Sequence, residues 1–207
     1  MPHTPPAAHP NPLLEAVRRR FASGAAPLGT LYGDQGARPE ARELRAASVL
    51  VPIVAHRPEP TVLFTRRTAH LKAHSGQISF PGGRAEPHDP SPEHTALRET
   101  EEEIGLPRVH VELLGRLSEY HTRTGYRITP VVGVVSPPFE LRPDANEVAE
   151  VFEVPLSFVL DAANHQQHYR EHEGERRGYF AIPYRDYYIW GATAGMLVNL
   201  HRYLAQG

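Results

Sequence analysis

Apolar residues recur along the chain at two different spacings, and these predict a mixture of helices and strands. Leu13, Leu14, Val17 and Phe21 follow the spacing of a helix with one buried face, whereas short runs rich in Val, Ile and Leu between Gly- and Pro-containing turns indicate strands. The predicted helices cover 12–22, 92–104, a short segment near Leu156, and 190–204; the predicted strands cover 47–55, 61–66, 109–120, 128–135 and 151–154. Elements mixed in this order favour an α/β fold, in which helices cover a mixed β-sheet.

The chain is expected to comprise a short N-terminal extension and one domain. Residues 1–12 are rich in Pro and His, a composition typical of a flexible segment, and a helix follows them. Clusters of Gly, Pro and Asp over 23–42 indicate a connection. We therefore expect an extension over 1–43 and a globular domain over 44–207, since 40% hydrophobic residues in a chain of 207 are enough for one core.

Composition and charge exclude several classes of protein. The chain has no cysteine, which excludes disulfides, thiolate nucleophiles and Cys-ligated zinc, and its net charge of −2 does not favour binding to nucleic acid or to a membrane surface. Its start lacks the basic and apolar regions of a secretory signal, and no apolar stretch is long enough to span a bilayer. We expect a cytoplasmic protein with a small-molecule substrate; the oligomeric state is left open.

The helix over 92–104 has unusually clear ends. Ser91 is a typical N-cap, Pro92 suits the first helical position, and Gly105 followed by Pro107 predicts the end. On this helix, the face expected to meet the core carries three residues, namely Leu97, Thr100 and Ile104.

The other face of this helix carries an acidic stripe. Glu99, Glu102 and Glu103 are spaced by three and four residues and so project from one side, with Arg98 able to reach Glu102 one turn away. Together with Glu101 they place four carboxylates near the C-terminal end, where the helix dipole disfavours negative charge. A solvated acidic face is one interpretation, and a site for Mg²⁺ or Mn²⁺ is the other.

The segment RETEEEIGL resembles the second half of the Nudix hydrolase box, G-x5-E-x7-R-E-U-x-E-E-x-G-U, where U is aliphatic. Thr100 stands where the box has an aliphatic residue, and Asp89, six residues after Gly83, stands where it has a glutamate. Eight residues rather than seven separate Asp89 from Arg98. The additional residue falls in the loop before the helix, so we expect the stripe to be undisturbed.

The preceding segment, LFTRRTAHLKAHSGQISFPGG over 63–83, resembles the signature of the coenzyme A pyrophosphatase branch of that family. Phe64, Thr68 and Lys72 replace the Leu, Ser and Arg of the signature. Eight positions are in register, namely Thr65, Arg67, Ala69, Gly76, Phe80, Pro81, Gly82 and Gly83. Two adjoining motifs are much harder to match by chance than one, so the resemblance is specific.

This resemblance implies a Nudix-type α/β/α sandwich with a mixed β-sheet and a hydrolase that depends on Mg²⁺ or Mn²⁺. The implied reaction is cleavage of the pyrophosphate of coenzyme A or its thioesters to 3′,5′-ADP and 4′-phosphopantetheine or its acylated form. The alternatives are a Nudix hydrolase of another nucleoside diphosphate derivative, such as ADP-ribose or a dinucleoside polyphosphate, and a non-catalytic module that senses a nucleotide.

Residue roles follow from the resemblance for the acidic stripe. Glu99 and Glu103 match the usual metal ligands, Glu102 is an additional ligand or a group that orients water, and Arg98 orients the cluster. The catalytic base is open among Glu102, Glu147 and Glu150, and the last two can equally belong to an acidic strand edge.

Basic and glycine residues near the box are the candidates for binding substrate. Arg67 and Lys72 occupy signature positions and suit pyrophosphate or the 3′-phosphate, whereas the neighbouring Arg66 is the weaker candidate. Gly82 and Gly83 allow close approach of the backbone to phosphates, although a tight turn alone would also explain them. The aromatic residues of 184–190 either stack on adenine or pack the last helix against the sheet.

Overall fold

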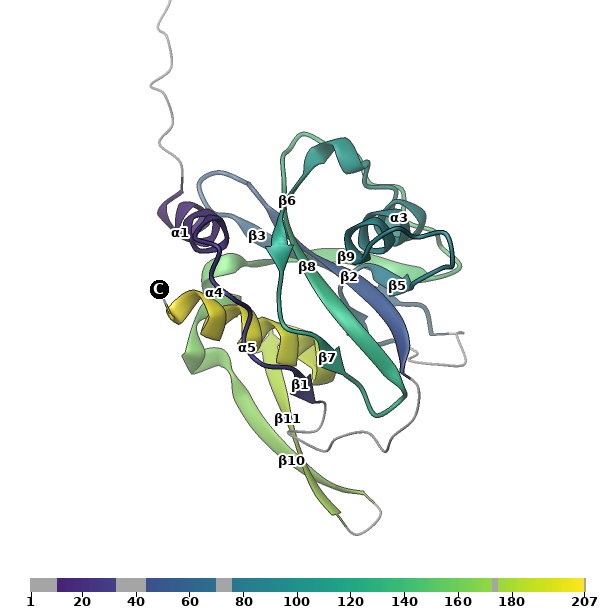
Figure 1. Ribbon diagram of the computed structural model, residues 1–207, viewed down its shortest axis with the longest axis vertical. Helices are drawn as coiled ribbons and strands as arrows, with labels where there is room; N and C mark the ends of the chain where they lie inside the picture. The colour runs from purple at the N-terminus through teal and green to yellow at the C-terminus, as the bar shows by residue number, and fades with distance from the viewer. Residues whose placement is uncertain (1–10, 33–43, 70–75, 173–174, 207) are drawn as a thin grey trace, which may run out of the picture.

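The computed structural model describes residues 11–32, 44–69, 76–172 and 175–206. Its centre is a mixed sheet with helices α3 (Pro92–Ile104) and α5 (Gly191–Ala205) on opposite sides (Figure 1). Leu50 points to the α3 side, where it packs with Ala96, and the next residue, Val51, joins the core on the α5 side. This alternation along a central strand gives each face of the sheet its own helix.

The longest pairing in the sheet joins two central strands. β2 (Arg45–Val54) and β8 (Tyr126–Val135) run parallel over their full length, and antiparallel strands flank both of them. The order of the sheet is β1-β7-β8-β2-β3-β4, and β5, β6 and β9 pair with β2, β8 and β3. The remaining strands of the sheet are β1 (Leu31–Tyr32), β3 (Thr61–Arg67), β4 (Ile78–Ser79), β5 (Gly82–Arg84), β6 (Val111–Arg116), β7 (Tyr120–His121) and β9 (Val148–Pro155).

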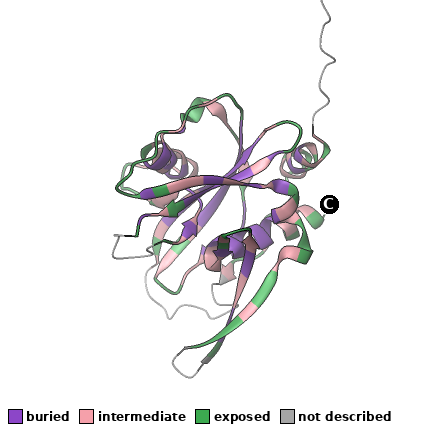
Figure 2. Ribbon diagram, turned by 180° about the vertical axis from the view of Figure 1, so that it is seen from behind, coloured by how far each residue is buried: buried purple, intermediate pink, exposed green. Residues whose placement is uncertain are grey.

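The N-terminal helix α1 (Pro12–Ala22) has the bounds that its apolar spacing predicts. The Asn11 side chain caps it by accepting hydrogen bonds from the backbone N–H groups of residues 13 and 14. Leu14 and Val17 are buried in the main core, so α1 packs against the domain (Figure 2). The division of the chain at residue 43 lies outside the described residues and stays a prediction.

Most predicted elements are found, and one needs correction. The continuous strand expected over 109–120 is wrong: Val109 lies in a 3₁₀ turn and is 86% exposed, β6 ends at Arg116, and β7 begins only at Tyr120. Between the two strands the Ser118 hydroxyl donates a hydrogen bond to the carbonyl of Leu28. A contact with a residue so distant in sequence leaves no local signal in the sequence.

The short helix predicted near Leu156 is α4 (Leu156–Leu160).

A second sheet was not predicted. It consists of three antiparallel strands, β10 (Gln166–His172), β11 (Glu175–Tyr184) and β12 (Tyr187–Trp190), and its outer part extends away from the domain (Figures 1 and 2). The sequence of β10, QQHYREH, lacks the alternation of apolar and polar residues that indicates a half-buried strand. No helix among the described residues has the length and apolar character needed to cross a membrane.

Candidate active site

Helix α3 carries the acidic stripe, and its ends are the predicted ones. The Ser91 hydroxyl accepts a hydrogen bond from the backbone N–H of His94 at 3.3 Å, and Gly105 ends the helix in the left-handed conformation with φ 67°. The buried face is only partly the expected one. Thr100 and Ile104 are buried as predicted, but Leu97 is only partly buried. The Thr100 hydroxyl donates to the Ala96 carbonyl at 2.6 Å, which satisfies a polar group where the box has an aliphatic one.

Gly82 and Gly83 bring β5 against both β2 and α3. They pair with Val49 and Ser48 of β2. A Cβ on Gly82, whose φ is +150°, would lie 2.5 Å from the Cα of Val49, and a Cβ on Gly83 would lie 2.5 Å from the Glu99 carboxyl carbon. Glycine at 82 therefore permits the strand pairing, and glycine at 83 leaves room for the Glu99 carboxylate.

Glu103 is a nearly buried carboxylate, with 6% of its surface exposed. Its Oε2 accepts the backbone N–H of Gly82 at 3.1 Å, and its Oε1 lies 3.6 Å from Nη1 of Arg67. Burial, aided by the nearby carboxylates of Glu99 and Glu147, raises the pKa of Glu103 to about 7 against the opposing effect of the Gly82 N–H and Arg67. This position concentrates negative charge that a cation would stabilise.

Arg98 links the other two glutamates of the stripe. Its Nη2 lies 3.0 Å from Oε1 of Glu99, and its Nη1 donates to Oε2 of the more exposed Glu102 at 3.0 Å. The same guanidinium donates to the carbonyl of Arg84 at 3.1 Å, next to the glycine turn. Burial raises the pKa of Glu99 despite Arg98, and repulsion from Glu102 and Glu147 adds to that shift.

Asp89, which stands in place of the glutamate of the box, holds Arg98 from the other side. Arg98 donates to both of its oxygens, with Nε–Oδ1 3.1 Å and Nη2–Oδ2 3.0 Å, and the Thr95 hydroxyl donates to Oδ2 at 2.9 Å. The Arg98 guanidinium holds the pKa of Asp89 well below its usual range, and the nearby ring of His94 acts in the same direction. A shorter aspartate therefore still makes a two-point contact with Arg98.

The two later acidic candidates, Glu147 and Glu150, have different surroundings. Glu150 pairs with Arg66 at 2.5 Å and accepts a hydrogen bond from the Tyr187 hydroxyl at 2.6 Å, so it belongs to a structural network on β9. Glu147, which precedes β9, is close enough to raise the pKa of both Glu99 and Glu103. The register of β3 against β9 shifts between Arg66 and Arg67, and the two arginines accordingly pair with different carboxylates.

The donor set suits a hard divalent cation. Glu99 and Glu103 are partly or nearly buried carboxylates that repel each other, and carboxylate oxygens are the ligands that Mg²⁺ and Mn²⁺ prefer. Within the described part of the chain, no three His, Asp or Glu side chains already surround one point. Arg98 and Arg67 contact the carboxylates instead.

A cavity of about 760 Å³ opens beside the glycine turn. Gly82, Gly83 and Arg67 line one part of it, and Arg45 with the turn between β7 and β8 lines another. Lys72, the remaining predicted substrate ligand, lies outside the described residues. Among the aromatic residues of 184–190 only Trp190 lines this cavity.

The other aromatic residues of that segment pack within the fold. Tyr187 stacks on Phe152 with ring centroids 3.7 Å apart, and Tyr184 meets Phe158 edge to face at 4.8 Å. Packing therefore accounts for Tyr184 and Tyr187, whereas Tyr188 is 44% exposed.

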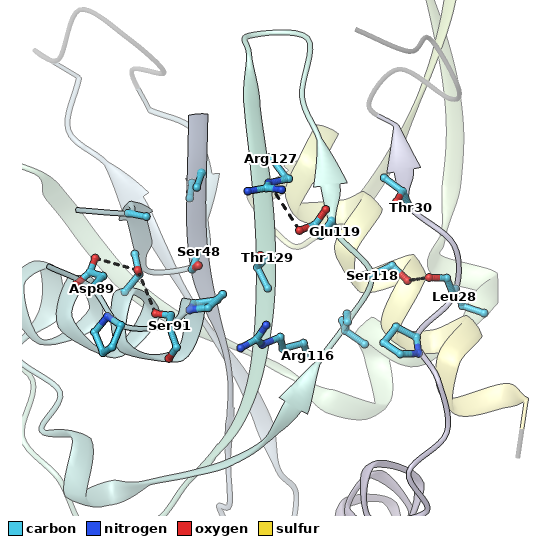
Figure 3. A pocket seen from close by; sticks show the side chains of 18 residues that line it. Leu28, Thr30, Ser48, Asp89, Ser91, Arg116, Ser118, Glu119, Arg127 and Thr129 are labelled. Atoms are coloured by element: carbon cyan, nitrogen blue, oxygen red, sulfur yellow. Dashed lines mark hydrogen bonds and ion pairs between the residues drawn. The ribbon is translucent and has the colours of Figure 1, made fainter. Parts of the chain in front are cut away.

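A second cavity of about 540 Å³ lies on the α3 side of the sheet (Figure 3). Ser48 and Thr129 lie between the start of α3 and the segment around Leu28 (Figure 3). Both arginines that line it are paired with acids: Arg116 with Glu93 at 2.5 and 2.8 Å, and Arg127 with Glu119 at 3.7 Å. Its charge is balanced, which makes it a poor receptor for a multiply charged phosphate compound.

Comparison with known proteins identifies the family. The family model described as the NUDIX domain matches residues 44–173. A protein of Photorhabdus laumondii named "Uncharacterized Nudix hydrolase NudL" is 42% identical over 156 residues, which are 75% of this chain and 83% of the relative. A protein of the same name from Yersinia pestis is 42% identical over 162 residues, 78% and 79% of the two chains. The chain therefore belongs to the Nudix family.

The fold agrees with this membership. A MutT/nudix family protein from Enterococcus faecalis superposes with a TM-score of 0.51 at 15% identity, over 83% of this chain and 66% of that one. The predicted Nudix-type α/β/α sandwich with a mixed sheet is confirmed. The chain is thus a Nudix hydrolase that acts on a nucleoside diphosphate derivative, a class of enzyme that generally uses divalent metal ions.

Proposed function

We propose that this hydrolase cleaves the pyrophosphate of coenzyme A or its thioesters. The sequence signature over 63–83 supports this substrate, and its residues contribute to the cavity through Arg67, Phe80, Gly82 and Gly83. The observation that carries the proposal is the contact of the buried Glu103 with the Gly82 N–H and Arg67, because it joins a carboxylate cluster to the wall of a cavity lined by arginines.

The reaction is a hydrolysis without a covalent enzyme intermediate. The oxygen of a water molecule forms a bond to one phosphorus, and the bond from that phosphorus to the bridging oxygen breaks. The leaving phosphate takes that oxygen and its electron pair, and the proton lost by the water is transferred to a base. The products are 3′,5′-ADP and 4′-phosphopantetheine, or its acylated form.

Glu99, Glu102 and Glu103 are the side chains that would hold Mg²⁺ or Mn²⁺. When bound, the cation screens the anionic phosphate oxygens and stabilises the charge that develops on the leaving phosphate. The backbone N–H of Gly82 orients Glu103, and Gly83 leaves space for Glu99 beside the turn. Arg98, held by Asp89, positions the glutamates and is therefore a positioning residue.

Two candidates remain for the base that accepts the proton of water. Glu102 is exposed on α3, and Glu147, in the loop before β9, lies near enough to raise the pKa of Glu99 and Glu103. Glu150 is disfavoured because Arg66 and Tyr187 already occupy its carboxylate. The variants Glu102→Gln and Glu147→Gln separate the two: loss of the base lowers kcat and removes the acidic limb of the pH–rate profile.

Arg67 and the glycine turn are the proposed pyrophosphate contacts. Arg67 lines the cavity, and phosphate binds a guanidinium group at two points. Gly82 and Gly83 leave the backbone of β5 open to close approach. Lys72 is proposed to assist from the signature segment on the strength of its position in the sequence alone.

Product analysis tests the proposed function. We expect the protein with Mg²⁺ or Mn²⁺ to convert coenzyme A into products with the masses of 3′,5′-ADP and 4′-phosphopantetheine. Glu103→Gln should fold and lose about 100-fold or more in kcat. The control is Glu101→Gln, because Glu101 pairs with Arg108 on the outer side of the same helix. Normal activity of Glu103→Gln would refute the role of this carboxylate.

The same assay separates the alternatives. Faster turnover of ADP-ribose or a dinucleoside polyphosphate than of coenzyme A would assign the enzyme to another nucleoside diphosphate derivative. Binding of nucleotide without any product, with Mg²⁺ and with Mn²⁺, would instead indicate a sensing module.

A further inference from the structure

The charge lining the larger cavity is of one sign. Five charged side chains lie among the described residues that line it, and all five are arginines: Arg45, Arg67, Arg84, Arg123 and Arg170. A single pyrophosphate beside the glycine turn does not account for arginines distributed around the whole cavity. The ligand should therefore carry negative charge in more than one place.

Two of these arginines gather at the turn between β7 and β8, away from the glycine turn. Arg45 donates its backbone N–H to the Gly125 carbonyl at 2.9 Å and its Nη2 to the Thr124 carbonyl at 3.3 Å, and Arg123 belongs to the same turn. The turn is closed by the Thr122 N–H, which donates to the Tyr126 carbonyl at 2.8 Å. Arg45, the first residue of β2, is thus hydrogen-bonded to the turn that carries Arg123.

The position of this pair relative to the pyrophosphate contacts follows from the strand register. Gly82 lies opposite Val49, and Arg45 lies four residues before Val49 on the same strand. At the rise of a β-strand these four residues span about 13 Å. Arginine side chains are long, so the guanidinium group of Arg45 can lie closer to the glycine turn than the backbone does. The two proposed phosphate sites are then separated by roughly the length of one nucleoside.

Arg45 is held ready to bind an anion. Its guanidinium carbon lies 4.2 Å from the centre of the Tyr126 ring, a cation–π contact that uses the face of the guanidinium. Nη2 donates to the Thr124 carbonyl, and the other N–H groups can donate to an anion. Among the described residues, no carboxylate forms an ion pair with Arg45. Arg67, by contrast, lies 3.6 Å from Glu103 and is therefore at the end of the cavity proposed to bind the pyrophosphate. An arginine already ordered on a ring loses less entropy on binding phosphate.

We propose that Arg45 and Arg123 form a subsite for a second phosphate group of the substrate, remote from the pyrophosphate. In the proposed function, on which this inference rests, that group is the 3′-phosphate of coenzyme A. The subsite lets the enzyme distinguish 3′-phosphorylated adenosine compounds from those that lack this phosphate. Arg67 and Lys72, the candidates from the sequence, then serve the pyrophosphate.

The kinetic test compares coenzyme A with dephospho-coenzyme A. For Arg45→Gln/Arg123→Gln we expect kcat/KM for coenzyme A to fall at least about tenfold, mainly through KM, while kcat/KM for dephospho-coenzyme A stays within about twofold. Arg19→Gln, compared with each single variant Arg45→Gln and Arg123→Gln, is the matched control, because each of the three removes one arginine charge and Arg19 lies on the exposed side of α1. An equal loss on both substrates, or no loss on coenzyme A, would overturn the subsite.

A binding measurement keeps this inference separable from the proposed reaction. Calorimetric titration with 3′,5′-ADP and 5′-AMP requires no turnover, and we expect the wild type to bind 3′,5′-ADP at least about tenfold more tightly and the double variant to lose that preference. A wild type without the preference, or a double variant that keeps it, refutes the subsite. If the preference is present and lost as expected but coenzyme A is not hydrolysed, the subsite stands and the proposed reaction fails.

Discussion

Asp89 and Arg98 form a two-point ion pair, with Nε–Oδ1 3.1 Å and Nη2–Oδ2 3.0 Å, between the loop before α3 and the middle of that helix. The same guanidinium contacts Glu99 and Glu102. Asp89 therefore determines the position of the arginine around which the glutamates of α3 are arranged. Since its side chain is almost fully buried, the pair is shielded from solvent.

Asp89→Asn keeps the shape of the side chain and removes its charge. We expect kcat to fall more than about tenfold, because Arg98 loses its anchor, and the free energy of unfolding to fall by about 2–3 kcal/mol. Steady-state kinetics and urea unfolding measure the two effects. The control is Glu93→Gln on the same helix, which breaks the Arg116 pair and does not contact Arg98. Wild-type kcat in Asp89→Asn would contradict the anchoring role.

Asp89 also predicts how stability depends on acid. The pKa of its carboxyl is lowered below the ordinary value of 3.8, chiefly by the hydrogen bonds from Arg98. The contribution to stability is complete above that value and is lost as the pH falls below it, because the unfolded chain takes up the proton first. Thermal unfolding between pH 5 and pH 2.5 should therefore show a shallower decline for Asp89→Asn than for the wild type. Parallel curves would refute this assignment.

The two glycines of β5 should fail in different ways when changed to alanine. In Gly82→Ala the new Cβ would meet the backbone of Val49 and Ser48, which cannot move aside, so the protein should lose about 1–3 kcal/mol of stability or more. In Gly83→Ala the Cβ meets the end of the Glu99 side chain, which can turn away. We expect a melting temperature close to that of the wild type and a higher concentration of Mn²⁺ for half-maximal activity.

Gly125→Ala serves as a control for this pair, since its added Cβ would meet no atom within 4 Å, although its φ of +86° carries a backbone cost. If Gly83→Ala lowered stability as much as Gly82→Ala and left the Mn²⁺ requirement unchanged, the close approach of Gly83 to the Glu99 carboxylate would not contribute to metal binding.

His165 should make the protein less stable in mild acid. Its Nε2 lies 2.9 Å from the Val159 carbonyl, and the ring of His201 lies 5.2 Å away. Burial, aided by His201, lowers the pKa of His165 below 6.5. The unfolded chain therefore binds the proton more readily, and stability falls as the pH drops below 6.5. His165→Gln should reduce the slope of melting temperature against pH between 6.5 and 5. His168→Gln, on the exposed strand β10, should not.

Asn199 is a polar residue in the core of α5. It is 1% exposed, and neither its amide nitrogen nor its amide oxygen has a hydrogen-bond partner among the described residues. Asn199→Leu should stabilise the protein by about 1–3 kcal/mol, which differential scanning calorimetry would detect as a higher melting temperature. Asn164→Leu should have the opposite effect, because it removes a hydrogen bond to the Phe158 carbonyl. A lower melting temperature for Asn199→Leu would show that its amide is satisfied in solution.

Local signals in the sequence predicted the helices well. The bounds of α3 depend on Ser91, Pro92 and Gly105, which act through their own backbone conformation and nearest neighbours. The same holds for α1, whose apolar spacing identified the face that enters the core. The burial of Leu97 was predicted wrongly because which part of a helix face meets the sheet depends on the angle at which the helix packs.

The sequence by itself determined the acidic helix with Glu99, Glu102 and Glu103, the arginine behind them and the glycine turn, since these lie within one short segment. Only the tertiary structure decided which residues meet that segment. Glu147 lies near enough to raise the pKa of Glu99 and Glu103, Glu150 pairs with Arg66, and Arg45 and Arg123 line the same cavity. These contacts depend on strand pairing between distant parts of the chain. Such pairing follows from packing of the whole core rather than from the conformational preference of each segment.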